Sequence, residues 1–431
     1  MRILFVNQYY WPDYAATAQQ MSDLAEWLVE RGHDVHVVCS RGQYDDGTGR
    51  PSPKRETRRG VHIHRLRAPG FAKGSGLGRL IDYAGFHLLV GLWLLTRGWR
   101  FNAVVTLTTP PLIGIYATAL RLLSFGKVRH VCWAMDLHPD LEFDLGMWSP
   151  RHPLYALLGR LNDAHFRRAS AVVALGEAMA ERLAEKGIKP SKLHTISVWN
   201  RADQIEPDAP DAAALKREQG FEGKFVVMYS GNAGVIHTFD AVREAMRRLK
   251  HDDRFAFVFV GSGKRLPELV EFAEAEGIAN FRRLGYFPRE RLSASLGMGD
   301  AHLVTLRPEM RGVAVPCKTY GIMAAARPVL FVGGPDADTA RQVRAGEAGY
   351  VVAHDDPDGL VDAMLQLADD PAHAGRLGRN GRAYFEARAE RAVCCRAWTE
   401  LLESLGGAPA KGAAMTDEPS TGASADRAPS T

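Results

Sequence analysis

Short apolar runs alternate with longer amphipathic stretches along most of the chain. The first unit has an apolar run at residues 2–6, an amphipathic stretch at 18–31 and a second apolar run at 34–39. Such runs predict buried strands and such stretches predict helices, so the unit is βαβ with parallel strands. The same pattern predicts further strands near residues 61–65, 103–107, 128–134, 171–175 and 193–197.

A second series of the same kind follows a polar stretch rich in Asp and Pro at residues 203–211. Its strands are expected near residues 225–230, 255–261, 301–306, 328–332 and 350–353. The pattern predicts an α/β fold of two Rossmann-like, doubly wound domains that face a central cleft. Ligands of such sheets bind at the carboxyl ends of the strands. The expected domains are residues 1–198 and 199–387, followed by a helix at 388–405 that crosses back to the first domain.

Composition narrows the class of protein. The 431 residues are 46% hydrophobic and 24% charged, which is typical of globular proteins, and the net charge of +4 does not by itself indicate nucleic-acid binding. Five cysteines without CxxC spacing fit neither a disulfide framework nor a zinc site and indicate a reducing compartment. The chain opens on a strand rather than a leader, so we expect a cytoplasmic protein. Residues 406–431, rich in small residues and without aromatics, predict a disordered tail.

Two glycine-rich turns follow expected strands of the second domain. The first contains Gly231, Asn232 and Gly234 and precedes a helix expected near His237; the second is Gly261-Ser262-Gly263-Lys264. Glycines at a strand–helix junction let backbone amides approach a phosphate. In a parallel sheet both turns would share one edge. An ordinary tight turn explains the first pattern equally well.

A charged loop follows the expected strand at 301–306. It carries Glu309, Arg311 and Lys318, and then a helix with small residues begins. This set suits a sugar diphosphate, because Glu309 can accept hydrogen bonds from sugar hydroxyls and Lys318 can offset phosphate charge. The alternative is a solvated charged loop.

Asp136 and His138 follow the expected strand at 128–134 in the first domain. At the carboxyl end of a doubly wound sheet, either side chain can take a proton from a hydroxyl nucleophile. The alternatives are a turn-capping role for Asp136 and a surface imidazole for His138.

Four segments together resemble glycosyltransferase family 4, which has the GT-B fold: LAEWLVERGHDVHVV, MDLHPD, YSGNAGVIHTFDAV and VPCKTYGIMAAARPVLFVG. They are most similar to bacterial enzymes that build O-antigen, capsule or colanic-acid-type polysaccharides. The similarity covers roughly residues 1–405. It implies transfer of a sugar from a nucleotide diphosphate to a hydroxyl acceptor, with retention at the anomeric carbon and without a metal or other cofactor. The donor-binding residues would be Gly231, Asn232, Gly234, His237, Gly261, Lys264, Glu309, Arg311, Gly312, Val313, Lys318 and Tyr320, and the catalytic residues Asp136 and His138.

The chain departs from the family pattern at two of these positions and at Gly321. Asn232 and His237 stand where many members have Arg and Lys, which leaves the diphosphate to Lys264, Arg311 or Lys318. Gly321 stands where many members have the glutamate that binds ribose. A nucleotide-sugar 2-epimerase of GT-B fold and a non-enzymatic sugar-nucleotide-binding protein are the alternative functions.

The apolar stretch at residues 80–95 is shorter than the roughly 20 residues that cross a membrane. With Leu92, Trp93 and Trp99 bounded by arginines, it predicts a helix that lies in the lipid headgroup layer. The basic run at 50–67 would add attraction to anionic lipid and lacks the interleaved aromatics of a nucleic-acid site. We therefore expect a peripheral enzyme on the inner face of the cytoplasmic membrane with a lipid-linked glycan acceptor. The alternative is a buried core helix.

Overall fold

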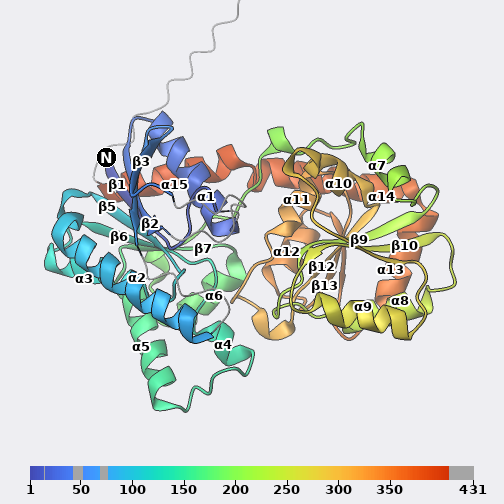
Figure 1. The fold of residues 1–431 in the computed structure, drawn as a ribbon, viewed down its shortest axis with the longest axis horizontal. Helices are drawn as coiled ribbons and strands as arrows, with labels where there is room; N and C mark the ends of the chain where they lie inside the picture. The colour runs from blue at the N-terminus through green and yellow to red at the C-terminus, as the bar shows by residue number, and fades with distance from the viewer. Residues whose placement is uncertain (14, 42–51, 68–75, 407–431) are drawn as a thin grey trace, which may run out of the picture.

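The computed structural model describes residues 1–13, 15–41, 52–67 and 76–406 and consists of two α/β domains side by side (Figure 1). The predicted fold class, two Rossmann-like domains, is confirmed. The expected tail from residue 407 onward and the first part of the basic run, residues 50 and 51, lie outside the described residues.

The first domain is built on an eight-stranded sheet with the strand order β3-β4-β2-β1-β5-β6-β7-β8. All neighbouring strands are parallel except β3, which pairs antiparallel with β4. The pattern did not predict β3 because its sequence, RETR, carries no apolar residue and its strand lies at the sheet edge. The strands are β1 Arg2–Val6, β2 Asp34–Ser40, β3 Arg55–Arg58, β4 Val61–Leu66, β5 Ala103–Leu107, β6 Arg129–Trp133, β7 Ala171–Ala174 and β8 Leu193–Thr195.

Helix α2 contains the apolar stretch singled out from the sequence, and its two faces differ. Phe86, Val90 and Leu94 are buried against strand residues of the first sheet, whereas Leu88 and Leu92 on the other face are 71% and 60% exposed. The core-helix interpretation therefore holds for one face of α2, and the other face is exposed to solvent. The expectation that Trp93 faces outward is wrong, because its side chain is 8% exposed and packs in the core. The helices of this domain are α1 Ala16–Glu30, α2 Gly76–Arg97, α3 Gly114–Leu123, α4 Asp140–Asp144, α5 Pro153–Arg168 and α6 Glu177–Glu185.

The second domain has a six-stranded parallel sheet with the order β11-β10-β9-β12-β13-β14. Its strands are β9 Phe225–Asn232, β10 Phe255–Ser262, β11 Phe281–Leu284, β12 Ala301–Thr305, β13 Val329–Val332 and β14 Gly349–Val352. The helices around it are α7 Ala212–Glu218, α8 Asp240–Arg248, α9 Leu266–Ala275, α10 Leu292–Met298, α11 Lys318–Ala324, α12 Asp338–Ala345, α13 Pro357–Asp369 and α14 Pro371–Arg388.

The chain passes between the domains twice. The helix expected at residues 388–405 is α15 (Arg391–Gly406), which begins just after α14 ends at Arg388 and returns along the first domain beside α1 (Figure 1). The two crossings are hydrogen-bonded to each other, since the amide of Asn200 donates to the carbonyl of Ala389 at 3.2 Å and the amide of Arg391 donates to the carbonyl of Asn200 at 3.1 Å. Within the described ranges, no helix is both long and apolar enough to span a bilayer.

Aromatic packing fastens α15 to the first domain. The ring of Trp398 lies 4.6 Å from that of Trp133 at the end of β6, and the indole N–H of Trp27 donates to Thr399 Oγ1 at 3.2 Å. Because Trp398 is fully buried, this helix belongs to the core of the first domain although the sequence reaches it only after the second.

Candidate active site

Two glycine turns lie at the carboxyl edge of the second-domain sheet, which we term the second-domain wall of the expected cleft. Strands β9 and β10 are neighbours, and Gly231 stands opposite Gly261 at their carboxyl ends, so both turns lie on one sheet edge. Their φ angles of 129° and 124° lie in a region that favours glycine. A side chain at Gly261 would also collide with the backbone, because its Cβ would lie 2.4 Å from the carbonyl oxygen of Gly231. The turns therefore present backbone rather than side chains to a ligand.

Lys318, the first residue of α11, brings a positive charge to these turns. Its Nζ lies 3.7 Å from the centre of the Tyr229 ring and 3.7 Å from the point where a Cβ of Gly231 would be. The Nζ is shielded from solvent and has no hydrogen-bond partner among the described residues. Burial lowers the pKa of Lys318 to about 7. An unpartnered buried ammonium next to a backbone turn is suited to an anionic ligand.

His237 lies behind the same turn as a neutral ring. Its Nδ1–H donates to the carbonyl of Thr305 at 2.5 Å, and its ring meets Tyr229 edge-on. Burial, together with the nearby Lys318 ammonium, lowers the pKa of His237 to about 3. The position where many family 4 members carry a cation therefore holds an uncharged imidazole in this chain.

The other predicted donor-binding side chains are spread over the rim and the core. Asn232 and Lys264 are exposed, and Glu309 is exposed with its carboxylate 3.7 Å from Arg307. Tyr320 is 1% exposed, so it packs in the core rather than lining open space. Gly231, Gly261, His237 and Lys318 therefore lie close together, whereas Tyr320 is buried in the core.

The loop that contains Arg311, Gly312 and Val313 reaches across the cleft. Arg311 pairs with Glu181 of α6 in the first domain at 2.5 Å, and the carbonyl of Val313 accepts from the amide of Leu137 at 3.0 Å. Gly312 has a φ of 68°, and a Cβ there would lie 2.5 Å from the carbonyl oxygen of Ala178. Arg311 is thus engaged with a carboxylate. Glu181 could not be found from the sequence pattern because it lies in the other domain.

Asp136 forms the first-domain wall. The loop that carries it is fixed by Thr108, whose Oγ1 accepts from the amides of Met135 and Asp136 at 3.2 and 3.3 Å. The side chain remains open to solvent while protein surrounds it on its other sides. This enclosure raises the pKa of Asp136, the carboxylate of Glu142 raises it further, and His138 acts in the opposite direction. A carboxylate with a raised pKa is a stronger base than an ordinary aspartate.

His138 is tied to Glu142, a residue that the sequence analysis missed. The Nδ1–H of His138 donates to Glu142 Oε1 at 2.8 Å, one helical turn further along the chain on α4. Burial disfavours the charged ring, but the Glu142 and Asp136 carboxylates outweigh it and raise the pKa of His138. The ring is therefore protonated over a wider pH range than a free imidazole, which favours Asp136 as the base. The spacing of four residues between His138 and Glu142 was the sequence signal that could have indicated this hydrogen bond.

Two family models match the chain, a glycosyl transferase 4-like domain over residues 16–199 and a glycosyl transferases group 1 domain over residues 224–370. Together they cover the greater part of both domains. The chain belongs to the family 4 glycosyltransferases. The resemblance drawn from the motifs is confirmed, and the enzyme class is a glycosyltransferase rather than an epimerase or a non-enzymatic binder.

Known proteins agree with this assignment. The chain is 27% identical over 287 residues to the probable glycosyltransferase WbjE of Pseudomonas aeruginosa, a match that covers 65% of this chain and 70% of the relative. It is 24% identical to the putative colanic acid biosynthesis glycosyl transferase WcaI of Escherichia coli K12, covering 75% and 81%.

Solved structures confirm the GT-B fold of this glycosyltransferase. The sucrose-phosphate synthase of Thermosynechococcus elongatus superposes with a TM-score of 0.75 at 16% identity and covers 94% of this chain and 99% of its own. The Anabaena protein HepE, in complex with UDP and glucose, superposes with a TM-score of 0.70 at 16% identity and covers 94% and 100%.

Proposed function

We propose that this glycosyltransferase transfers a sugar from a nucleotide-diphosphate sugar to a hydroxyl of a lipid-linked glycan, in the synthesis of a cell-surface polysaccharide. The observation that carries the proposal is the unpartnered Lys318 ammonium beside the turns of Gly231 and Gly261. A buried cation next to backbone amides stabilises a diphosphate, both in the donor and as a leaving group. HepE bound to UDP supports the class of donor, and WcaI, named for colanic acid, supports the class of product.

In the proposed reaction the acceptor oxygen forms a bond to the anomeric carbon while the bond from that carbon to the diphosphate oxygen breaks. The nucleoside diphosphate leaves with the electron pair, and Lys318 offsets the charge that develops on it. Asp136 orients the acceptor hydroxyl and takes its proton. The acceptor enters on the face of the sugar that the diphosphate leaves, so the anomeric configuration is retained, and no step uses a metal.

Exposed apolar side chains on the first domain support an acceptor held at a membrane. Helix α3 packs between α2 and α5 on one side of the domain (Figure 1). All three helices, with the turn after α3, carry large exposed apolar residues, which we term the apolar face: Leu88, Leu92, Leu95, Leu122, Leu123, Phe125, Leu154, Leu157 and Leu161. Side chains of this kind next to cations suit insertion into the headgroup layer.

A cationic pocket of about 470 Å³ adjoins the apolar face at the carboxyl ends of β2 and β4. Leu89, Leu92 and Trp93 of α2 form its apolar side. Its charged side consists of Arg41, Lys54, Arg55, Arg65, Arg67 and Arg97, and the ring of His64, whose pKa burial lowers to about 4, adds a neutral polar group. The volume and charge suit the phosphate of a lipid headgroup or of a lipid-linked acceptor.

Several cations of the basic run at residues 50–67 form ion pairs and so are less available to lipid than the sequence predicts. Arg58 and Arg59 pair with Glu26 of α1, and Arg65 pairs with Glu56 at 2.7 Å. Folding therefore brings a second carboxylate, that of Glu26 in α1, to these cations in addition to Glu56. Lys54, Arg55 and Arg67 remain exposed at the pocket.

The donor and the stereochemistry can be tested directly. Thermal melting of the full chain with UDP- and GDP-linked hexoses should show a raised melting temperature for one of them, since a bound ligand stabilises the folded state. NMR of the glycoside formed from that donor should show the anomeric configuration of the donor. Absence of both stabilisation and transfer across the panel would overturn the donor assignment, and an inverted product would overturn retention.

Vesicle flotation tests the membrane surface. The protein should float with vesicles that contain phosphatidylglycerol at low salt and detach in part as salt screens the pocket. Leu92→Ser combined with Leu95→Ser should abolish flotation without unfolding, since both side chains are exposed. Tyr286→Ser, at an equally exposed apolar residue of the second domain, should float normally. Flotation that the double variant does not weaken would remove α2 from the surface.

A further inference from the structure

Four polar side chains gather on one face at the edge of the first sheet. On β2, Asp34 and His36 alternate with Val35 and Val37, which are buried on the opposite face. Strand β4 has the same alternation, with His62 and His64 on the polar face, and the parallel register places His36 opposite His62. Because side chains alternate along a strand, the sequences DVH and HIH form a single cluster when these strands pair.

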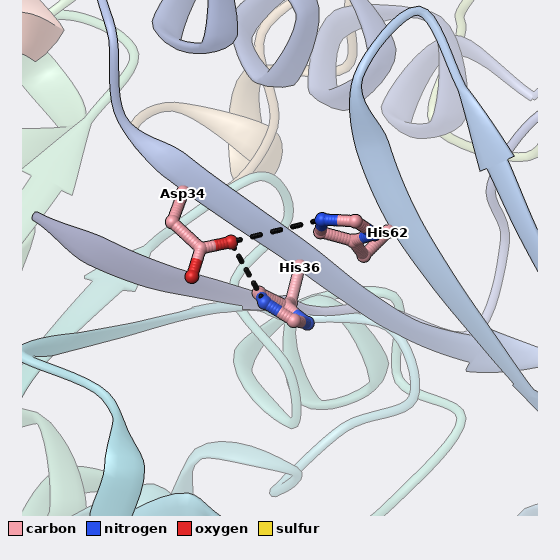
Figure 2. Close-up of side chains that lie close together, drawn as sticks. All are labelled: Asp34, His36 and His62. Carbon is pink, nitrogen blue, oxygen red and sulfur yellow. Dashed lines mark ion pairs between the residues drawn. The ribbon is translucent and has the colours of Figure 1, made fainter.

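Three of these side chains converge on a common point. Figure 2 shows Asp34 and His36 from one strand and His62 from the next, pointing toward one another. Asp34 Oδ1 lies 2.9 Å from His36 Nε2 and 3.9 Å from His62 Nε2, and all three atoms lie within 4.8 Å of one another. Zinc–ligand bonds of about 2.0–2.1 Å in a tetrahedron place neighbouring ligand atoms about 3.3 Å apart. The separations of 2.9 Å and 3.9 Å lie on either side of this ligand–ligand distance.

The remaining polar atoms of the three residues are held by other groups. His62 Nδ1 lies 3.2 Å from Thr57 Oγ1 on β3, and His36 Nδ1 lies 3.2 Å from His64 Nε2. Arg2 Nε donates to the second carboxylate oxygen of Asp34 at 2.8 Å. Hydrogen bonds at the far nitrogen fix the orientation of metal-binding histidines, and here they leave both Nε2 atoms and Oδ1 directed at the common point.

We propose that Asp34, His36 and His62 bind one zinc ion, with solvent in the fourth position. Imidazole and carboxylate ligands suit zinc, and the side-chain exposures of 40%, 14% and 46% leave a path for the ion and for a water ligand. The site lies at the amino ends of β2 and β4, opposite the cleft edge, so its effect is on strand pairing. It fastens β4, which supplies His64 and Arg65 to the cationic pocket, to β2 in the body of the sheet.

Metal binding can be measured on the untagged full chain after removal of metals with a chelator. Calorimetry with zinc should show one ion bound per chain, and zinc should raise the melting temperature because it binds the folded pairing of β2 and β4. Cobalt(II) as a probe should give the intense visible absorption bands of a tetrahedral nitrogen and oxygen site. Absence of uptake of either metal would overturn the proposal and leave a carboxylate in polar contact with two imidazoles.

Single substitutions show whether the metal binds at Asp34, His36 and His62 or at other histidines of the chain. His62→Ala, at a side chain that is half exposed, should fold and lose both the calorimetric site and the cobalt bands. Thr57→Val keeps all three ligands and should weaken zinc binding by roughly 10- to 100-fold, the usual effect of removing an outer hydrogen bond. His354→Ala, at an exposed histidine of the second domain, is the matched control and should bind normally. Undiminished binding by a folded His62→Ala protein would place the metal elsewhere.

Discussion

The two walls of the cleft differ in the groups that carry their chemistry. The second-domain wall consists of backbone at Gly231 and Gly261 with one buried ammonium, that of Lys318. The first-domain wall consists of side chains, the carboxylates of Asp136 and Glu142 with His138 hydrogen-bonded to the latter. A wall made of backbone and a cation holds an anion in a fixed place, whereas a wall of carboxylates can exchange protons. We therefore propose that donor binding and proton transfer belong to different domains, so that each can be altered separately.

The largest effect is expected from the first-domain wall. Asp136→Asn keeps the shape of the side chain but removes its basicity, and loss of a general base slows turnover about 100- to 10,000-fold. Initial rates should show this loss, while calorimetry should show unchanged affinity for the nucleoside diphosphate. Asp355→Asn, at an exposed aspartate of the second domain, is the control. Full turnover by a folded Asp136→Asn enzyme would refute the division of roles.

The second-domain wall should show the reverse pattern. Lys318→Met retains the length of the side chain and removes its charge, which should weaken binding of the nucleoside diphosphate roughly 10- to 150-fold, corresponding to about 1.5–3 kcal/mol for a charge-assisted hydrogen bond. Lys264→Met, at an exposed lysine of the neighbouring turn, should bind nearly as well as the wild type. Equal affinities of the two variants in calorimetry would remove Lys318 from the site.

The pH dependence of nucleoside-diphosphate affinity tests the role of the Lys318 charge more closely. Since burial holds the pKa of Lys318 at about 7, the side chain is mostly neutral in the empty cleft at pH 8.5. Only the protonated form attracts the diphosphate, so affinity should fall as pH rises above 7, by at most about tenfold per pH unit. Calorimetry between pH 7 and 9 should show this slope in the wild type and its loss in Lys318→Met. A slope that persists in the variant would belong to another group.

The smallest effect concerns the contact between the walls. Gly312→Ala places a Cβ 2.5 Å from the carbonyl oxygen of Ala178 at a positive φ, which should destabilise the closed cleft by about 1–3 kcal/mol. Thermal melting should detect the loss, and small-angle scattering should detect a larger radius of gyration. Gly285→Ala, where a Cβ meets nothing within 4 Å, is the control. Identical behaviour of the two variants would show that this contact does not hold the walls together.

Sequence reasoning succeeded where the determining interactions are local. The apolar runs of β9 and β12 predict their own burial, and each glycine turn follows its strand directly. Strands β3 and β11 escaped notice because RETR and FRRL have charged residues where an apolar run would be, and these edge strands are defined by backbone pairing. The same limit applies to Glu26 and Glu181, whose arginine partners are distant in the sequence. Contacts between distant segments must be known before such pairs can be assigned.

The double passage of the chain between the domains has a mechanical consequence. A single connecting segment would let the second domain rotate freely relative to the first. Two connecting segments, hydrogen-bonded to each other at Asn200 and Arg391, resist twisting of one domain against the other. With Trp398 anchored in the first domain, we expect the remaining relative motion of the two domains to be rotation about a single axis. The residues of α15 pack on α1, β5 and α14, yet we expect them to help keep Lys318 and Asp136 aligned when the domains move.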